Sequence, residues 1–294
     1  MNIELSIITV NYNGLKDTCA LIDTIPLDKT TEVIVVDNGS KVDEAAIIRQ
    51  RFPHVTAIRS EQNLGFAGGN NIGIQEATGK YLFFVNNDTI FEEFNVRALI
   101  QQLESSANIG MVCPKIRFAW APQPIQFAGY TPLSAVTLRN QAIGYGEDDH
   151  GQYDTPHPTP YAHGAAMLTK REAVEHVGLM PECYFLYYEE LDWSLMFTRA
   201  GYQIWYNPIC TIFHKESQST GADSPLKTYY ITRNRLLFAS RNCKGAERYA
   251  TYCYLTGIVA VRDLLRHLLG RRIDLAKATL RGINDFYFSN RQQK

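Results

Sequence analysis

The segment Tyr81-Leu-Phe-Phe-Val-Asn-Asn-Asp88 is a short apolar run that ends in two amides and a carboxylate. Five consecutive apolar or aromatic residues are typical of a parallel strand that is covered on both faces. Ligands of open α/β sheets gather at the carboxyl ends of such strands. Asn86 and Asp88 are two residues apart, which puts both side chains on one side of an extended backbone, toward a metal ion or a sugar nucleotide. The alternative is a strand that stops in an Asn-Asp turn.

Strands and helices alternate around this segment. Apolar runs predict strands over residues 5–11, 32–37, 55–59 and 109–115, and helical spacing predicts helices over residues 15–24, 42–51, 64–78 and 92–105. This alternation indicates βαβ units and a parallel sheet. Asp37 ends the second strand and places another carboxylate at the carboxyl edge.

The pattern changes after residue 115. Six prolines between residues 116 and 160 indicate irregular strands and loops, a region where a specificity pocket can be built. Order resumes with a strand over 163–169 and a helix over 170–177, and a later strand over 210–214 ends in His214. A histidine at a strand edge is either a ligand or an ordinary surface residue.

A glycine-rich segment, Leu64–Gly73, opens the third helix but matches neither Gly-x-Gly-x-x-Gly nor a Walker loop. Its glycines indicate either a backbone that approaches an anion at a helix N-terminus or tight packing of the helix.

Acidic residues also open a later helix, at Glu189-Glu-Leu-Asp192. The helix dipole favours carboxylates in a first turn, so helix capping is one interpretation. The aromatic approach Tyr184–Tyr188 favours another, because it would desolvate a carboxylate behind it and raise its pKa toward that of a base.

Composition narrows the function classes. The 294 residues are 45% hydrophobic and 20% charged with a net charge of −1, which excludes a general nucleic-acid binder. The start Met-Asn-Ile-Glu-Leu has no signal-peptide pattern, so we expect a cytoplasmic protein. The six cysteines form no Cys-x-x-Cys pair, and no apolar stretch is long enough to span a bilayer.

Several motifs follow one another at matching spacing, and together they resemble family 2 glycosyltransferases, in the branch often labelled rhamnosyltransferase-like. The motifs are Ile7–Asn13, Val35–Ser40, Asn63–Gly73, Asn86–Thr89, Gly164–Met167, Tyr187–Asp192 and His214, with Tyr229–Asn234 beyond them. The resemblance covers about residues 3–240.

The resemblance implies an α/β protein of the GT-A fold, with a Rossmann-like, mostly parallel sheet flanked by helices, and a C-terminal helical extension. It implies a nucleotide-diphosphate sugar donor, a saccharide or lipid-linked saccharide acceptor, Mn²⁺ or Mg²⁺, and inversion at the anomeric carbon, in cell-surface polysaccharide or glycolipid synthesis. The implied domains are a transferase domain over 1–240, with donor and acceptor halves at 1–115 and 116–240, and a basic extension over 241–294.

The resemblance also implies residue roles. Asp88 and His214 would bind the metal, Glu190 would be the general base with Glu189 as the alternative, and the acceptor would contact Gly164, Ala165 and Asp192. The residues implied for the nucleotide sugar are Thr9, Asn11, Asp37, Asn63, Gly69, Asn70, Asn86 and Asn87.

Two departures from the family pattern keep other functions open. Asn86-x-Asp88 stands where Asp-x-Asp is usual, and Glu190 stands where the base is usually Asp. The alternatives are a non-catalytic nucleotide-sugar-binding protein and a sugar-1-phosphate nucleotidyltransferase, although the latter lacks its expected glycine and arginine loop in Asn11–Gly14.

The C-terminal extension is basic, with 11 Lys and Arg against 4 Asp and Glu over residues 241–294. Within 249–269, apolar residues recur at helical spacing at positions 255, 258, 261, 265 and 268, beside Arg262, Arg266 and His267. This face either packs against the transferase domain or rests on an anionic membrane surface.

Overall fold

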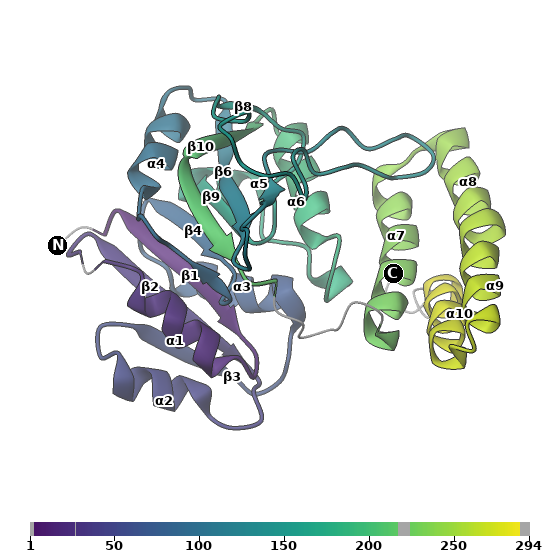
Figure 1. The fold of residues 1–294 in the computed structure, drawn as a ribbon, viewed down its shortest axis with the longest axis horizontal. Coiled ribbons are helices and arrows are strands. Elements are labelled where there is room, and N and C mark those ends of the chain that lie inside the picture. The colour runs from purple at the N-terminus through teal and green to yellow at the C-terminus, as the bar shows by residue number, and fades with distance from the viewer. Residues whose placement is uncertain (1–2, 27, 217–223, 289–294) are drawn as a thin grey trace. The chain divides into compact units, whose positions relative to one another are not determined.

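The computed structural model describes residues 3–26, 28–216 and 224–288 (Figure 1). Their Cα atoms cluster into two compact units, both assembled from separate chain segments. Unit 1 comprises Met1–Thr131, Gln141–Glu182 and Glu189–Glu216, and unit 2 comprises Pro132–Asn140, Cys183–Tyr188 and Ser217–Lys294.

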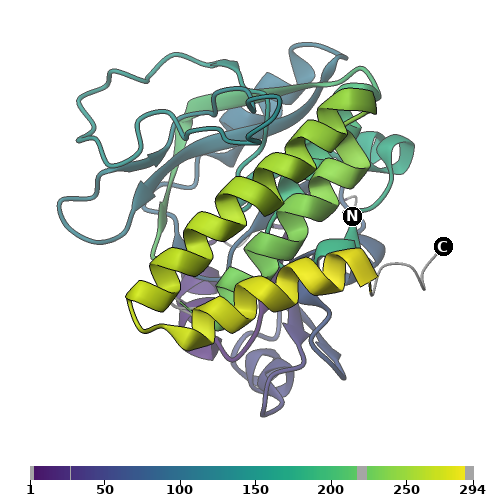
Figure 2. The same cartoon turned by 90° about the vertical axis from the view of Figure 1, so that its right-hand side faces the viewer.

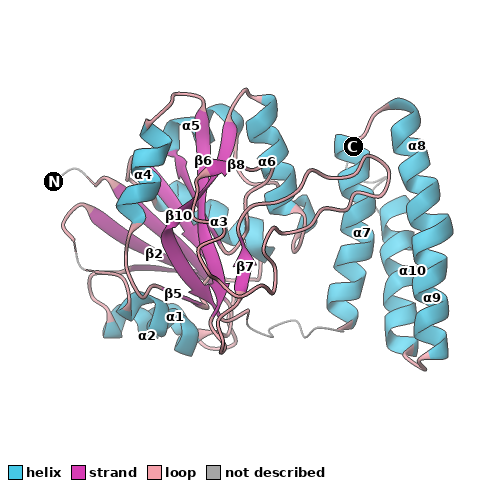
Figure 3. Cartoon of the chain, turned by 45° about the horizontal axis from the view of Figure 1, so that its top comes forward, coloured by secondary structure: helices cyan, strands magenta, loops and turns pink. Residues whose placement is uncertain are grey.

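Unit 1 is built on one ten-stranded sheet, in the order β3-β2-β1-β4-β9-β6-β10-β5 with β7 beside β6 and β8 beside β10 (Figure 3). The strands are β1 (Leu5–Asn11), β2 (Thr31–Asn38), β3 (Thr56–Ser60), β4 (Tyr81–Val85), β5 (Thr89–Ile90), β6 (Ile109–Phe118), β7 (Ile125–Phe127), β8 (His157–Pro158), β9 (Ala166–Lys170) and β10 (Gln203–His214).

The predicted parallel sheet forms its first half. β3, β2, β1 and β4 run parallel, as the βαβ pattern requires. The second half is mixed, because β9 inserts antiparallel between β4 and β6, while β6 and β10 are parallel to each other. All five residues of β4 are buried, which confirms the strand covered on both faces.

Helices cover both faces of this sheet. They are α1 (Leu15–Asp23), α2 (Glu44–Arg51), α3 (Gly65–Glu76), α4 (Val96–Glu104), α5 (Arg171–Val177) and α6 (Glu189–Arg199). Asn11 of β1 bonds to Thr18 of α1 and Glu44 of α2, whereas the preceding residue, Val10, faces α3. Successive strand residues point to opposite faces, so α1 and α2 lie on one face and α3 on the other.

Glycine makes the packing of α3 possible. A Cβ at Gly69 would lie 2.7 Å from a methyl carbon of Val10, which is closer than side chains approach. The helix therefore lies against β1 at a separation that only glycine allows. Of the two interpretations of the glycine-rich segment, tight packing accounts for Gly69.

The helix predicted over 92–105 begins later, at Val96, because the chain after Asp88 forms β5 and pairs with β10. The strand predicted over 109–115 continues to Phe118, because both β10 and β7 pair with its second half. A two-residue strand carries no periodic signal, so β5 has no counterpart in the sequence pattern.

Unit 2 is helical (Figure 2). Its helices are α7 (Pro225–Asn242), α8 (Gly245–Cys253), a π-helical segment (Tyr254–Val259), α9 (Ala260–Leu269) and α10 (Ile273–Phe288). α10 packs closely on α7, where a Cβ at Gly282 would lie 2.9 Å from the carbonyl oxygen of Tyr229. Within the described residues, no helix is both long and apolar enough to cross a bilayer.

The apolar face predicted for the extension is largely exposed. Leu255 and Ala260 are buried in unit 2, but Ile258 is 61% exposed, Leu265 56% and Leu269 85%, and Val261 and Leu268 are exposed beside them. Leu255, the first position of the predicted face, packs within unit 2, and so does Ala260. Whether the exposed positions pack against the transferase domain or rest on a membrane stays a prediction.

Candidate functional site

The antiparallel insertion of β9 builds the candidate site. Val85 at the end of β4 pairs with Ala166 at the start of β9, and the Asn86 N–H donates to the Ala165 carbonyl over 2.9 Å. The carboxyl end of β4 therefore meets the Gly164-Ala165 segment. On the other side, Thr89 of β5 pairs with His214, the last residue of β10.

The structure brings together Asp88 and His214, the two residues implied as metal ligands. His214 Nε2 lies 3.1 Å from Asp88 Oδ1, and both side chains are almost fully buried. The other ring nitrogen, Nδ1, lies 2.9 Å from Gln126 Oε1 of β7 and donates to it. The Nε2 atom faces the Asp88 carboxylate, and the Asn86 amide nitrogen lies 3.3 Å from it.

This donor set fits a divalent cation. A carboxylate oxygen and an imidazole nitrogen lie at contact distance, and both are atoms that bind divalent cations. Gln126 orients the imidazole in the way that outer-shell partners orient metal-binding histidines. No group of three or more His, Cys, Asp or Glu that could hold a metal ion converges anywhere in the described ranges.

Glu190 lies across from Gly164 in the first turn of α6. A Cβ built at Gly164 would lie 3.7 Å from Glu190 Cγ and 3.9 Å from its carboxyl carbon. Ser194 fixes the approach of the two segments, because its hydroxyl donates to the Glu190 carbonyl over 2.6 Å and accepts from the Ala162 N–H over 3.0 Å. Burial raises the pKa of Glu190, as the sequence predicts for an acid at this position.

The neighbouring acids of α6 differ in exposure. Glu189 and Asp192 are almost fully buried, whereas Glu190 is half-buried. Glu190 is thus the acid of this turn that solvent or an acceptor reaches.

Several residues implied for the donor bond within the protein. Asp37 is fully buried, and its carboxylate accepts from the Ser40 and Glu44 N–H groups and from the Arg59 guanidinium over 3.0–3.1 Å. Asn11 bonds to Thr18 and Glu44. A donor role for both stays a prediction.

The other implied donor residues line the same edge or lie in the interior. Asn63 accepts from Asn38 and the Gly65 N–H, Asn70 donates to the Phe66 carbonyl, and Asn87 donates to Thr18. The Thr9 hydroxyl is buried and has no hydrogen-bond partner in the described part of the chain. Their donor contacts also remain predictions.

Comparison with known proteins decides the family. Residues 6–178, more than half of the chain, match the family profile described as glycosyl transferase family 2. The chain belongs to glycosyl transferase family 2. This family 2 glycosyltransferase is 26% identical over 278 residues to the low-salt glycan biosynthesis hexosyltransferase Agl10 of Haloferax volcanii, covering 92% of the chain and 87% of the relative.

Rhamnosyltransferases are also among the relatives of the glycosyltransferase, in agreement with the rhamnosyltransferase-like motifs. The N-acetylglucosaminyl-diphospho-decaprenol L-rhamnosyltransferase of Mycobacterium tuberculosis is 22% identical over 268 residues, covering 84% of the chain and 86% of the relative. Two solved structures share the fold. A Pyrobaculum calidifontis mannosyltransferase in complex with GDP-Man and Mn²⁺ aligns with a TM-score of 0.60 at 14% identity, over 98% of this chain and 88% of that one.

The second structure, GalNAc-T7 with UDP, GalNAc and Mn²⁺, aligns with a TM-score of 0.61 at 14% identity, over 86% of this chain and 54% of that one. Both are GT-A glycosyltransferases, which confirms the GT-A fold predicted for the family 2 glycosyltransferase.

Sequence reasoning missed two aromatic groups at the site of the glycosyltransferase. His163 and Tyr130 stack with ring centroids 6.0 Å apart, and the His163 ring lies 6.5 Å from that of His214. Burial, and then the proximity of His214, lower the pKa of His163 to about 3, so its imidazole is neutral. Burial and the charge of Glu190 raise the pKa of Tyr130. His163 begins a predicted strand, but nothing in the pattern of residues 116–160 marks Tyr130 or Gln126.

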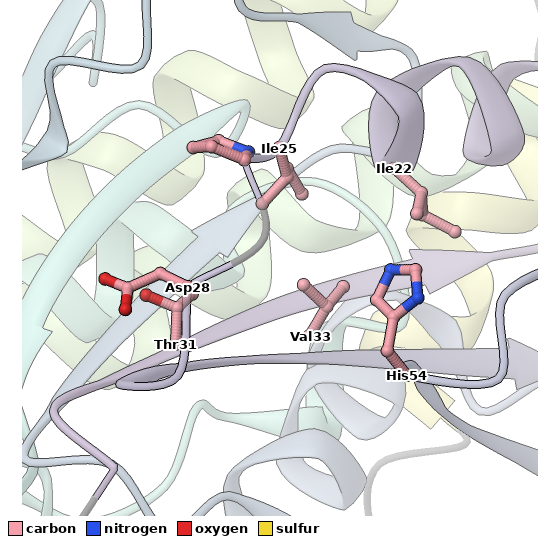
Figure 4. Close-up of a pocket in the computed structure, with 7 residues that line it drawn as sticks. Ile22, Ile25, Asp28, Thr31, Val33 and His54 are labelled. Carbon is pink, nitrogen blue, oxygen red and sulfur yellow. The ribbon is translucent and has the colours of Figure 1, made fainter.

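A small pocket of the glycosyltransferase lies elsewhere (Figure 4). Its lining includes Ile22, Ile25, Asp28, Val33 and His54, around the start of β2 and the end of α1. The amino end of β2 is the opposite end from the one that carries Asp37. The pocket is thus separate from the carboxyl edge where Asp88 and Glu190 lie.

Proposed function

We propose that this family 2 glycosyltransferase is a metal-dependent, inverting hexosyltransferase that moves a sugar from a nucleotide-diphosphate sugar to a hydroxyl of a saccharide acceptor. The observation that carries the proposal is the arrangement of Glu190 opposite Gly164, with the Asp88–His214 pair at the same edge of the sheet. One group is suited to take a proton, and the other to hold a cation. Metal-dependent inverting transfer uses both kinds of group.

The reaction needs a base on the acceptor side. The Glu190 carboxylate takes the proton of the acceptor hydroxyl while that oxygen forms a bond to the anomeric carbon of the donor. The bond from the anomeric carbon to the diphosphate oxygen breaks on the opposite face, which inverts the configuration and releases the nucleoside diphosphate. The raised pKa of Glu190 makes it a stronger base than an exposed carboxylate would be.

Asp88 and His214 would hold Mn²⁺ or Mg²⁺, which would neutralise the developing charge of the diphosphate. Gln126 bonds to His214 Nδ1, so Nε2 is the ring nitrogen that would bind the ion. His163, neutral because of its low pKa, adds no competing positive charge beside them.

The names of relatives support a rhamnosyl or other hexosyl donor and a lipid-linked acceptor. The Mycobacterium tuberculosis relative is named for an N-acetylglucosaminyl-diphospho-decaprenol acceptor, and a Shigella flexneri relative is named a dTDP-rhamnosyl transferase. We therefore place dTDP-rhamnose first among the donors to test, and cell-surface polysaccharide or glycolipid synthesis as the setting.

A thermal-shift panel tests the donor. UDP-, dTDP- and GDP-sugars are added with Mn²⁺, with Mg²⁺ and with a chelator, because a ligand that binds only the folded protein raises its Tm. The proposal expects one nucleotide class to raise the Tm with metal only, and transfer with that donor to give a product of inverted configuration by NMR. Slow metal-dependent hydrolysis of the donor separates an enzyme from the alternative of a non-catalytic binding protein. Release of pyrophosphate from a nucleoside triphosphate and a sugar 1-phosphate, added in place of the donor, would instead support the nucleotidyltransferase alternative.

We further propose that the exposed face of α9 rests on an anionic membrane surface, which would suit a lipid-linked acceptor. This surface, the α9 face, consists of Val261, Leu265, Leu268 and Leu269 of α9, with Ile258 of the π-helical segment just before it. Four arginines, Arg262, Arg266, Arg271 and Arg272, are exposed along or just beyond it. Each basic residue near an anionic surface contributes about 1 kcal/mol, in addition to the burial of the apolar side chains.

Vesicle sedimentation tests this contact. The full chain is mixed with phosphatidylcholine vesicles with and without phosphatidylserine, at low and at high salt. We expect sedimentation with the anionic vesicles at low salt, and its loss in a Leu265→Ser, Leu268→Ser double variant. The matched control is Ile209→Ser in unit 1, which is 61% exposed in β10. A chain that stays in the supernatant refutes the contact, and a dimer that the double variant abolishes would assign the face to a second copy.

A further inference from the structure

The six residues before α6 have an unusual backbone. Phe185, Tyr187 and Tyr188 have φ angles of 67°, 70° and 79°. These values lie in the left-handed region, which large side chains rarely adopt because of steric conflict with the backbone. Such conformations persist only where surrounding groups hold them, and they are common at functional sites. The segment Cys183–Tyr188, here called the aromatic loop, belongs to unit 2 and ends one residue before α6 begins.

Asn234 of α7 holds the aromatic loop. Its side chain is fully buried, and Nδ2 donates to the carbonyl oxygens of Tyr184, Leu186 and Tyr187 over 2.9, 2.6 and 3.0 Å. One amide group thus holds the carbonyl groups of three residues in the segment where the backbone is left-handed. A carboxylate of the same size has no hydrogen to donate, so no other side chain of this shape replaces it.

Arg233 fixes the orientation of that amide. Its Nε donates to Asn234 Oδ1 over 2.8 Å, which turns Nδ2 toward the loop. Its Nη2 donates to the carbonyl oxygens of Cys183 and Tyr184 over 2.9 and 2.7 Å. Rings add to the contact within unit 2, because Phe185 stacks on Tyr230 with the centroids 5.0 Å apart.

We propose that Asn234 is a positioning residue for sugar transfer, which acts by holding the aromatic loop in the left-handed conformation from which α6 starts. Glu190 is the second residue of α6, so the dihedral angles of Tyr187 and Tyr188 direct the chain that carries the carboxylate. This inference rests on the proposed role of Glu190 as the base. It adds that α7 contributes to the reaction although its own side chains are not assigned to either substrate.

The test compares Asn234→Asp with wild type. Asp keeps the size of the side chain but presents acceptors to three carbonyl oxygens. We expect kcat to fall at least tenfold with a donor KM within about twofold of wild type, because none of the residues proposed to bind the donor lies in the loop. We also expect faster amide hydrogen exchange over residues 183–190. The matched control, Asn284→Asp, makes the same change at an exposed position of α10 and should alter neither quantity.

A second variant covers the case in which Asn234→Asp does not fold. Arg233→Gln removes the guanidinium bonds to the loop and the bond that orients Asn234. We expect it to lower kcat and to speed amide exchange over residues 183–190, in both cases by less than Asn234→Asp does. Faster exchange over 183–190 with unchanged kcat would overturn the positioning role while leaving the proposed reaction intact. Unchanged exchange would overturn the role of Asn234 in the loop. If wild type transfers no sugar, the proposed function fails, and the exchange comparison still decides whether Asn234 holds the loop.

Discussion

Replacing Glu190 by Gln removes the group that we assign as the base and keeps nearly the same shape. The carboxylate is half-buried beside Gly164, so the uncharged amide fits the same space. Loss of a general base costs about 10² to 10⁴ in rate, which is about 3 to 5 kcal/mol of transition-state stabilisation at about 1.4 kcal/mol for each factor of ten. We expect kcat to fall within that range, and the donor KM to change little.

The same variant should be more stable than wild type at alkaline pH. Burial raises the pKa of Glu190 in the folded protein above its value in the unfolded chain, so the folded state holds the proton more tightly. The stability that comes from this difference is present below the unfolded pKa and is lost as the pH rises through the folded pKa. Gln does not ionise and avoids the loss. We therefore expect a higher Tm for Glu190→Gln at pH 8, and a difference that closes toward pH 4.

Glu189→Gln is the matched comparison, because it makes the same change one residue away at a buried carboxylate. We expect a change in kcat of less than about tenfold, well below the range for loss of a general base. The assay is initial rate against pH with donor and acceptor saturating. For wild type, kcat should rise with pH through the raised pKa of Glu190, and this limb should vanish in Glu190→Gln. Equal losses of kcat for both variants would refute the assignment of the base. A kcat of Glu190→Gln that still rises with pH as in wild type would also refute it.

Three further predictions concern the rest of the site. Gly164→Ala should leave stability within about 0.5 kcal/mol of wild type, since its Cβ makes only ordinary contacts, but should raise the acceptor KM by filling the space before Glu190; an unchanged acceptor KM would contradict this. Gln126→Leu, which removes the acceptor for His214 Nδ1, should raise the Mn²⁺ concentration for half-maximal activity by about 10 to 100-fold, whereas Gln126→Glu keeps an acceptor oxygen and should stay near wild type. Asp88→Asn and Asp88→Ala should both lose nearly all transfer. Wild-type turnover of the Asn variant at low Mn²⁺ would show that the carboxylate is not a metal ligand.

The local sequence pattern was sufficient to predict the strands of the parallel half of the sheet. β1, β2 and β4 are apolar runs followed by polar residues and turns, so pattern alone identifies them, whereas β3 has a weaker signal because only two of its five residues are apolar. The antiparallel position of β9 was not predictable in the same way. Its five residues are as apolar and buried as those of a parallel strand, and only its pairing with β4 and β6 distinguishes it. Pairing is a long-range property that the residues of one strand do not encode.

The same limit applies to the site. The resemblance to a family indicated Asp88, His214 and Glu190 because it fixes their order in the chain, and the structure brings Asp88 and His214 together, while the roles of all three stay predictions. Gln126 and Tyr130 come from the proline-containing region, where neither periodicity nor a motif marks a residue, and they reach the site through the short pairing of β7 with β6. The internal bonds of Asp37 could not be read from its position at a strand end, because the same position suits a ligand contact and a cap for α2.

The position of Glu190 also explains why helix capping and catalysis are hard to separate from sequence. The first turn of α6 favours a carboxylate through its free N–H groups, which lowers the pKa of any acid placed there. Burial acts in the opposite direction, and its effect is the larger one at Glu190, whose pKa is raised. A capping acid on an exposed helix would have only the first effect. A raised pKa is the direction that a base role predicts, and that role stays a prediction. The Ser194 bonds hold α6 against residue 162 beside this carboxylate.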